Sequence, residues 1–420
     1  MPSDSSINPD AGAASIEAVD AGAWNALNRG NNPFSDHRFL AALSACGCVG
    51  GDTGWHYAGQ SFEQLSDKLS NKLSDQLSDK SPEQSSDRLP NQPSENSAPF
   101  ANCPSGASAA TWLKFHSRGE FVFDFAWAEA AHRAGLRWYP KLLVAAPLTP
   151  VTGPRLLGHD SNARAALVDN LQACVDEHRL SSCAINFCDS VDQDTLDQTD
   201  WLQRFDWQFH WHNRGYRDFD AFLGALRSKP RKNVRRERRL AREDGWQYRW
   251  IDGDSIQAGE LETVANCYQT TFALYGNLPS LNRNFFEAAA MAFGGQFLVC
   301  MASRAGVDLA CSVFWRNDTR LFGRYWGSLV ETRDVHFEAC YYQGIEYCIE
   351  HGLNAFEPGA QGEHKIRRGF VPVRTRSYHY VRHPALREGI RRWLQMEGRA
   401  LEEYRENLMS IEPYREVAGP

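Results

Sequence analysis

Apolar side chains recur every three or four residues in several stretches of this chain, and this spacing indicates amphipathic helices. In residues 163–178, for example, Leu167 and Leu171 share one helical face. A shorter helix is expected to begin after an N-cap at Ser35 or Asp36. The same reasoning predicts further helices over residues 218–225, 228–244, 261–275, 285–293, 337–351 and 386–408.

Elsewhere apolar and polar residues alternate, which is typical of half-buried strands. The segments TWLKF and EFVFDFAWA between residues 111 and 128 alternate in this way. Further strands are predicted within residues 141–148, 183–188, 201–216, 246–251, 296–303, 307–317, 319–329, 354–359 and 374–381. The second half of the chain therefore has the order of two helices, three antiparallel strands, one helix and two strands.

Two segments lack the pattern of a packed core. Residues 1–22 are rich in Ser, Asp, Ala and Gly and are expected to be a disordered tail. Residues 61–110 begin with a four-residue repeat of leucines, whose stripe drifts by about 40° per repeat around a helix. Prolines and serines follow, so we expect a surface insertion, helical at most in its first third. A helix that binds a partner is the alternative interpretation.

Composition excludes several classes of protein. The 420 residues carry a net charge of −7 with a pI near 6.0, which argues against a generally basic nucleic-acid binder. No apolar run approaches the roughly 18 residues that span a bilayer, and the N-terminus lacks a signal-peptide pattern. The eleven cysteines form no CxxC pair, which favours reduced thiols and a cytoplasmic location.

The segment FEPGAQGEHKIRRGF, residues 356–370, is the densest group of reactive side chains. Glycines in such a loop let polar groups approach a ligand. Glu363 or His364 is the candidate proton acceptor, and Lys365 and Arg367 are candidates for contact with an anion. An ordinary charged loop with a salt bridge is the alternative.

The predicted helix before this segment carries a second candidate pair. Glu338 and Tyr342 are four residues apart and share one face. Tyr342 is a candidate acid toward a leaving thiolate, and the alternative is that the tyrosines belong to the core.

A strongly basic helix is predicted over residues 228–244. One side of it consists of Lys232, Arg235, Arg236 and Arg239. Such a side could hold tRNA phosphates, a CoA phosphate or anionic lipid, or it could be a solvated face that pairs with acidic residues. The pair His210 and His212 alone is too little for a metal site, so no metal is predicted.

Several segments together resemble one protein family. They are NPFSDHRFL at 32–40, GEFVFDFAWA at 119–128, WYPKLL at 138–143, PLTPVTGPRLL at 147–157, QFHWHNRGYRDFDAFL at 208–223, RKNVRRERR at 231–239, GRYWG at 323–327, HFEACYYQGIEY at 336–347 and FEPGAQGEHKIRRGFVPV at 356–373. They resemble the FemAB-like family of bacterial N-acyltransferases, which is related to the FemAB/FemX peptidoglycan transferases and to the GNAT superfamily.

This resemblance implies an α/β (α+β) fold of two GNAT-like units, each a mixed central sheet flanked by helices. The expected units are 23–210, which contains the insertion, and 211–400, which carries the site; residues 401–420 are the end of the last helix and a tail. In a GNAT unit two parallel strands splay around the donor. The implied donor contacts there are Gly323, Arg324, Trp326, Gly359, Gln361, Gly362, Lys365 and Arg367. Alternation places Arg324 and Trp326 on one face of their strand.

The implied function is transfer of an acyl group from acyl-CoA to a small-molecule or peptide-like amine. The FemX branch implies the alternative, an aminoacyl-tRNA donor and a peptidoglycan precursor, with the basic helix as a tRNA surface. A catalytically silent protein that binds an anionic ligand is the third hypothesis. The acceptor, the acyl group and the oligomeric state do not follow from the sequence.

Overall fold

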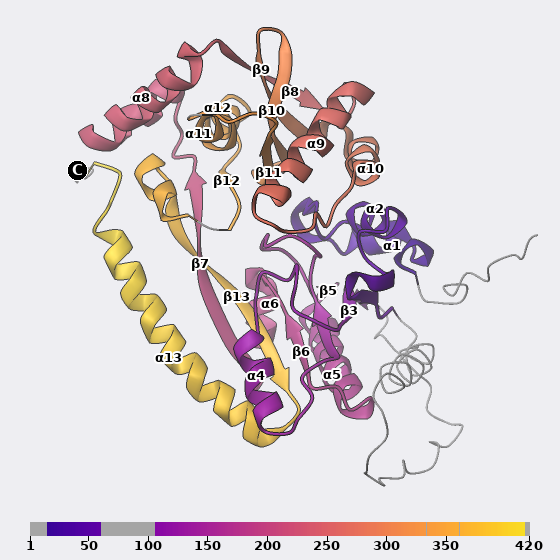
Figure 1. Cartoon of the computed structure of the whole chain (residues 1–420). Coiled ribbons are helices and arrows are strands. Elements are labelled where there is room, and N and C mark those ends of the chain that lie inside the picture. Colours follow the sequence, from indigo (N-terminus) through magenta and orange to yellow (C-terminus); the bar gives the residue numbers. More distant parts are fainter. Residues whose placement is uncertain (1–14, 60–105, 333, 361, 416–420) are drawn as a thin grey trace, which may run out of the picture.

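The computed structural model describes residues 15–59, 106–332, 334–360 and 362–415. Within these ranges eleven strands form one mixed sheet, in the order β1-β3-β4-β6-β13-β7-β12-β11-β10-β9-β8 (Figure 1). Its strands are β1 (Trp55–Tyr57), β3 (Thr111–Lys114), β4 (Lys141–Val144), β6 (Ser182–Ile185), β7 (Leu202–His212), β8 (Trp246–Asp252), β9 (Phe297–Arg304), β10 (Val307–Arg316), β11 (Arg320–Ser328), β12 (Ala355–Glu357) and β13 (Val371–Val381). A separate pair consists of β2 (Ala107–Ser108) and β5 (Leu157–Gly158).

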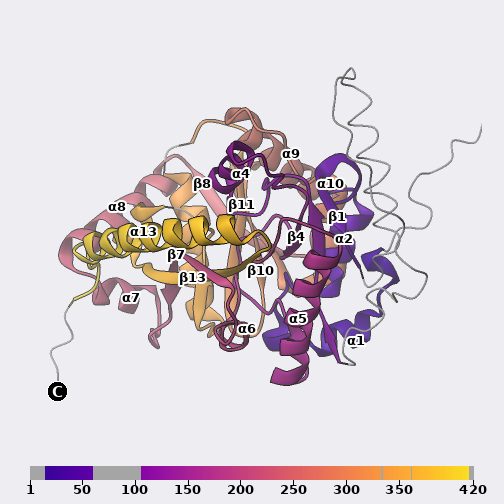
Figure 2. The same ribbon diagram turned by 90° about the horizontal axis from the view of Figure 1, so that it is seen from below.

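Helices flank both faces of the sheet (Figure 2). The α-helices are α1 (Ala21–Ala26), α2 (His37–Ala45), α4 (Phe125–Arg133), α5 (Ser161–Glu177), α6 (Ser190–Leu196), α7 (Phe219–Ala225), α8 (Ser228–Glu243), α9 (Ala258–Leu274), α10 (Arg283–Phe293), α11 (Val335–Phe337), α12 (Gln343–Glu350) and α13 (Pro384–Met409). A π-helical segment, η5 (Glu338–Tyr342), joins α11 to α12, and the 3-10 helices are η1 (Ile16–Ala18), η2 (Arg29–Asn31), η3 (Gly51–Thr53), η4 (Gly294–Gln296) and η6 (Glu363–Arg368). The expected α/β fold is confirmed.

Each half of the chain contains a parallel strand pair joined by a helix. β4 runs parallel to β6 with α5 between them, and β11 runs parallel to β12 with α12 between them. Parallel neighbours need such a crossover, because a short turn cannot return the chain to the same end of the sheet. The same arrangement of strand, helix and parallel strand therefore occurs twice in the chain.

β13 connects the two halves. It pairs antiparallel with β6 through Tyr378–Val381 and with β7 through Val371–His379. The predicted boundary at residues 210 and 211 falls inside β7, so the sheet continues across it. The division of the chain into two units therefore stays a prediction, and the sheet itself is not divided at that boundary.

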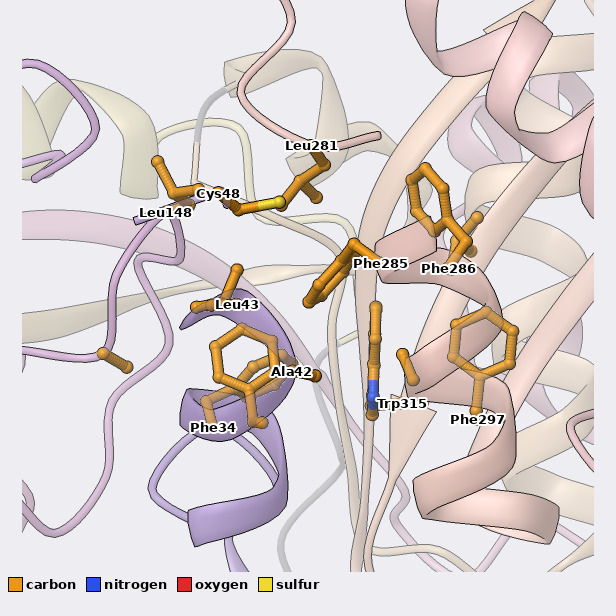
Figure 3. Close-up of a cluster of buried hydrophobic side chains, with 14 of the residues drawn as sticks. Phe34, Ala42, Leu43, Cys48, Leu148, Leu281, Phe285, Phe286, Phe297 and Trp315 are labelled. Carbon is orange, nitrogen blue, oxygen red and sulfur yellow. The ribbon is translucent and has the colours of Figure 1, made fainter. Parts of the chain in front are cut away.

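The N-terminal segment packs on the C-terminal half. Phe34, just before α2, lies 5.6 Å from Trp315 of β10, measured between ring centroids (Figure 3). By the same measure, Phe39 of α2 lies 5.9 Å from Phe285 of α10. Order also begins earlier than we expected, because Ile16 is fully buried in the same cluster. Residues 1–14 and 60–105, which hold most of the predicted tail and insertion, lie outside the described ranges.

Most predicted elements are confirmed, and one strand prediction is wrong. The alternating segment EFVFDFAWA forms a loop through Asp124, followed by α4. The cysteines of the described ranges are free thiols, most of them buried. Among the described helices, none combines the length and the apolar character that a bilayer span requires.

Candidate active site at a strand fork

β11 and β12 run parallel for a short distance and then separate. Arg320–Phe322 pair with Ala355–Glu357, after which β11 continues along β10 to Ser328 while β12 ends. Where two strands diverge, the hydrogen-bond ladder between them stops, and the facing backbone groups become available to a ligand. This fork lies within the C-terminal half of the sheet, at the strands from which the family resemblance implied donor binding.

A β-bulge lies on the β11 side of the fork. The register of β11 against β10 shifts by one residue, so that Arg324 is the extra residue. The prediction that Arg324 and Trp326 share a face is therefore wrong. The guanidinium carbon of Arg324 lies 5.6 Å from the centre of the Phe34 ring, whereas Trp326 packs against His336.

The glycines near the fork differ in their surroundings. Gly359 has a φ of 93°, in the left-handed region, and a side chain there would meet only the carbonyl oxygen of Gly323, at 3.8 Å. Space therefore remains beside Gly359. A side chain at Gly323 would lie 3.3 Å from the rings of Phe314 and Phe356, so that position is closely packed. Gly362 also has a positive φ, of 118°, and Gln361 lies outside the described residues.

Lys365 lies behind the fork, on η6. Its side chain is buried (2% exposed), and Nζ donates a hydrogen bond to the carbonyl oxygen of Gly359, 2.7 Å away. Burial lowers the pKa of Lys365 to about 7, because the ammonium form loses its hydration. We expected a surface cation that contacts an anion. The structure instead gives an amine that can gain or lose a proton near neutral pH.

The two candidate proton acceptors on η6 have tyrosine partners. The Nε2 atom of His364 lies 3.0 Å from the hydroxyl of Tyr341, and burial lowers the pKa of His364, with help from Arg368. Glu363 is exposed, and its carboxylate accepts a hydrogen bond of 2.8 Å from Tyr404 on α13. His364 is therefore mostly neutral and able to accept a proton at pH 7.

A buried ion pair ties η6 to α8. Arg368 donates to both carboxylate oxygens of Glu237, at 2.9 and 3.0 Å, and the Tyr342 hydroxyl donates to the same carboxylate. Burial raises the pKa of Tyr342 well above its ordinary value. These contacts favour a structural role for Tyr342, and its role as an acid remains a prediction.

Glu338 is also engaged in ion pairs. Its carboxylate is fully buried and accepts hydrogen bonds from Arg238, at 2.9 Å, and from Gln343, at 2.8 Å. Arg242 lies 3.5 Å from the same carboxylate. The geometry holds α8 against η5, and a catalytic role for Glu338 remains a prediction.

A cavity of about 400 Å³ lies between α8 and η6. It is lined by Asn233, Val234, Arg236, Glu237, Tyr342, Glu363, His364, Arg367, Arg368 and Ile411. The structure thus brings together the basic helix and the segment 363–368, which sequence analysis treated as separate motifs. Because Glu237 pairs with Arg368, the remaining charged side chains of the lining are the exposed cations Arg236 and Arg367 and the exposed carboxylate Glu363.

The predicted basic side of α8 is exposed. Arg235 and Arg239 have acidic neighbours, Asp220 at 3.8 Å and Glu243 at 2.9 Å. A second hollow of about 790 Å³, between α7 and α8, is lined by Arg235, Arg238, Arg239 and Arg242 together with Asp218, Asp220, Glu243 and Glu346. The cations of α8 therefore border two neighbouring concave surfaces.

The other side of the fork carries Arg324, which the family resemblance implied as a donor contact, and two groups that were not site candidates, Glu357 and His210. Glu357 is 3% exposed; its Oε1 accepts a hydrogen bond of 2.7 Å from Arg320, while Oε2 has no hydrogen-bond partner among the described residues. His210 Nε2 lies 4.0 Å from Oε2, and burial lowers the pKa of His210 to about 4. The Nε atom of Arg324 also lacks a partner within the described ranges. A buried carboxylate oxygen without a partner suits a cationic ligand.

The alternation of QFHWH on β7 did contain a signal for this group. It places Gln208 and His210 on one face, and the side-chain atoms Oε1 of Gln208 and Nε2 of His210 lie 3.2 Å apart. Glu357 stood inside the selected segment 356–370. What no pattern showed is that β7 and β12 are neighbours, paired through His212 and Ala355.

A family model described as FemAB-like, peptidoglycan biosynthesis/recognition, matches residues 15–416 of this chain. No curated protein matches the chain. Among solved structures, L-PGS from Bacillus licheniformis is 10% identical, with a TM-score of 0.42, and the match covers 68% of this chain and 86% of that one. A structure titled FemX is 12% identical, with a TM-score of 0.42 over 71% and 89% of the two chains. A tandem GNAT protein from the clavulanic acid biosynthesis pathway is 9% identical, with a TM-score of 0.32 over 67% and 85%.

Proposed function

This chain belongs to the FemAB-like family of transferases, and on that premise we propose that it transfers an acyl or aminoacyl group to an amine of a peptidoglycan-related acceptor. The observation that carries the proposal is Lys365, a buried amine with a pKa of about 7 beside the open backbone of the fork. An acyl transfer to an amine needs a group that takes a proton from the nucleophile and returns it to the leaving group. Lys365 fits both roles near neutral pH.

The acceptor amine enters on the side of Glu357. The unpaired Oε2 atom holds the ammonium group by a charge-assisted hydrogen bond. Lys365 interacts electrostatically with His210 and with Arg324, which lie on that side of the fork. Neutral His210 adds no competing positive charge there.

The bound ammonium group first loses one proton to water. A carbon–nitrogen bond then forms as the neutral amine attacks the carbonyl carbon of the donor. Neutral Lys365 takes a proton from the nitrogen. The carbonyl oxygen becomes negative, and we assign its stabilisation to the Nε–H of Arg324, which has no hydrogen-bond partner among the described residues. The carbon–oxygen or carbon–sulfur bond to the leaving group then breaks, and Lys365 returns the proton to the departing oxygen or sulfur.

For the donor we propose an aminoacyl-tRNA. The exposed cations of α8 border two hollows, one of them beside η6. The two hollows together are larger than the space that a single pyrophosphate would occupy. The family description, which concerns peptidoglycan, supports the same choice. A cytoplasmic location is part of this proposal, because aminoacyl-tRNA is a cytoplasmic donor, and the free thiols support it.

Acyl-CoA, the donor first expected from the sequence, is the second candidate. The splayed strands and the bulge at Arg324 support it, because they leave an edge of backbone for a pantetheine arm. A cavity of about 400 Å³ with Arg236 and Arg367 also suits the phosphates of CoA.

The donors are separated by comparing binding of a tRNA pool and of CoA to the wild type and to the double variant Arg236→Ala, Arg367→Ala. If tRNA is the donor, its binding weakens about tenfold and the salt slope falls by about two charges. The control is the double variant Arg391→Ala, Arg392→Ala on α13, which should bind tRNA as the wild type does. Tight CoA binding without tRNA binding would favour the second candidate.

A further inference from the structure

In the segment from Gly119 to Phe125, the buried and exposed side chains are the reverse of what its sequence pattern predicts. The alternation predicted a half-buried strand, in which the phenylalanines would form the buried face. In the structure Glu120 and Asp124 are buried, whereas Phe121, Phe123 and Phe125 are 40%, 46% and 57% exposed. Burying two carboxyl groups while exposing three aromatic rings runs against the ordinary driving forces of folding, so this arrangement asks for a functional reason.

Hydrogen bonds to the two buried carboxylates hold the loop in place. Lys141 donates to Glu120 at 2.7 Å, and Asp124 accepts hydrogen bonds from Trp138 and Tyr139, each at 2.7 Å. The base of the loop is therefore held by a network of charged and hydrogen-bonded groups within the protein.

The rings themselves are also ordered. Those of Phe123 and Phe125 stack with centroids 5.5 Å apart and an angle of 11° between their planes. Arg204 of β7 donates a 2.7 Å hydrogen bond to the carbonyl oxygen of Phe123. Phe121 adopts a φ of 60°, a conformation that bulky residues avoid. The loop thus presents preformed aromatic side chains outward.

We propose that Phe121, Phe123 and Phe125 insert into the surface of an anionic lipid bilayer and dock the protein there. Together the three rings expose roughly 300 Å², given that a phenylalanine offers roughly 200 Å². A standard protein interface takes about 800 Å² from each partner, so these rings alone are too small for one. Rings at the tip of a rigid loop can instead enter the interfacial layer of a bilayer without a matching surface.

The charges that flank the rings in the sequence favour an anionic surface. Arg118 precedes the rings by three residues, and Arg137 follows α4; both are exposed. On α4 itself Arg133 is balanced by Glu129, 3.7 Å away. The exposed residues between positions 116 and 137 therefore carry a positive excess, although the whole chain has a net charge of −7. Basic residues next to inserted aromatic rings strengthen binding to acidic headgroups.

The test is flotation of the full chain with vesicles of phosphatidylcholine that contain about one third phosphatidylglycerol, a proportion that makes the surface anionic. We expect the wild type to float with these vesicles. The triple variant Phe121→Ser, Phe123→Ser, Phe125→Ser should bind at least about tenfold more weakly, and Arg118→Glu with Arg137→Glu should weaken binding too. Unchanged circular dichroism and melting temperature would show that the variants fold.

The matched control removes three other exposed apolar side chains. Leu274, Leu278 and Met291 are 77%, 91% and 81% exposed, and their triple serine variant should float as the wild type does. The proposal fails if the wild type does not float, or if the Phe121, Phe123 and Phe125 variant still does. It also fails if that variant instead abolishes a concentration-dependent dimer in light scattering, since the rings would then bind a second copy of the chain. None of these results depends on transferase activity.

Discussion

Two lysines in this structure are buried in similar ways but serve different purposes. Burial lowers the pKa of both Lys114 and Lys365 to about 7. Lys114 donates to the carbonyl oxygen of Arg118 and lies 3.7 Å from the centre of the Trp55 ring, inside a packed cluster. Only Lys365 lies at a fork between strands. A shifted pKa therefore gains functional meaning from its position.

The pH dependence of transfer is the first prediction for Lys365. The neutral amine is the base, so kcat/KM should rise with pH, reach half its maximum near pH 7 and level off above pH 8 or so. Lys365→Arg stays protonated and should lose about a hundredfold in rate at every pH. A pH profile that is unchanged in a Lys365→Met variant would contradict the assignment.

Stability provides an independent check of the same pKa. The folded pKa of Lys365 lies below its ordinary value of 10.5, so the unfolded chain binds more protons between pH 7 and pH 10.5. The free-energy cost of burying this lysine is therefore greatest below pH 7 and decreases as the pH rises. Lys365→Met should be more stable than the wild type at pH 7, and the difference should shrink toward pH 10. Urea titrations at several pH values measure it.

The sequence indicated part of the site at the residue scale. It selected Lys365, His364 and Arg367 because reactive side chains cluster between glycines. It could not show that Lys365 is buried, because η6 turns that side chain inward while Arg367 stays exposed. Nor could it show that Glu357 keeps a carboxylate oxygen without a partner in the described structure, since that depends on the neighbouring strand β7.

Among the elements, the link between α8 and η6 shapes the cavity between them. Glu237→Gln would leave Arg368 buried without a charged partner, which should destabilise the fold by about 3 kcal/mol. The matched control is Glu243→Gln on the same helix, whose exposed pair with Arg239 contributes about 0–1 kcal/mol. Equal losses in a chemical denaturation experiment would contradict the role given to Glu237.

The elements themselves were mostly predictable. Helices such as α5 and α8 follow from strong periodicity, and their ends agree within a few residues. The failure at residues 120–128 has a physical cause, because Lys141 offers buried partners to Glu120 and Asp124 and so reverses the usual preference. The alternation of apolar and polar residues could not predict the bulge at Arg324 either, since an extra residue breaks strict alternation.

For the whole molecule, β13 and the aromatic cluster around Trp315 join the halves into one structure. We therefore expect one cooperative transition in calorimetry, with the calorimetric and van't Hoff enthalpies in agreement. A chain cut between residues 210 and 211 should not fold into two stable parts, because the cut falls within β7. Two separate transitions would contradict this view.

The central claim is that Lys365 at the fork catalyses acyl transfer to an amine. The most direct measurement mixes the protein with an aminoacyl-tRNA pool or acetyl-CoA and a peptidoglycan peptide that bears a free amine, and follows the new amide by mass spectrometry. We predict that the wild type forms the amide from aminoacyl-tRNA and that Lys365→Met, folded and still binding tRNA, does not. Equal product from Lys365→Met would contradict the claim, as would no product from either donor while the wild type binds both.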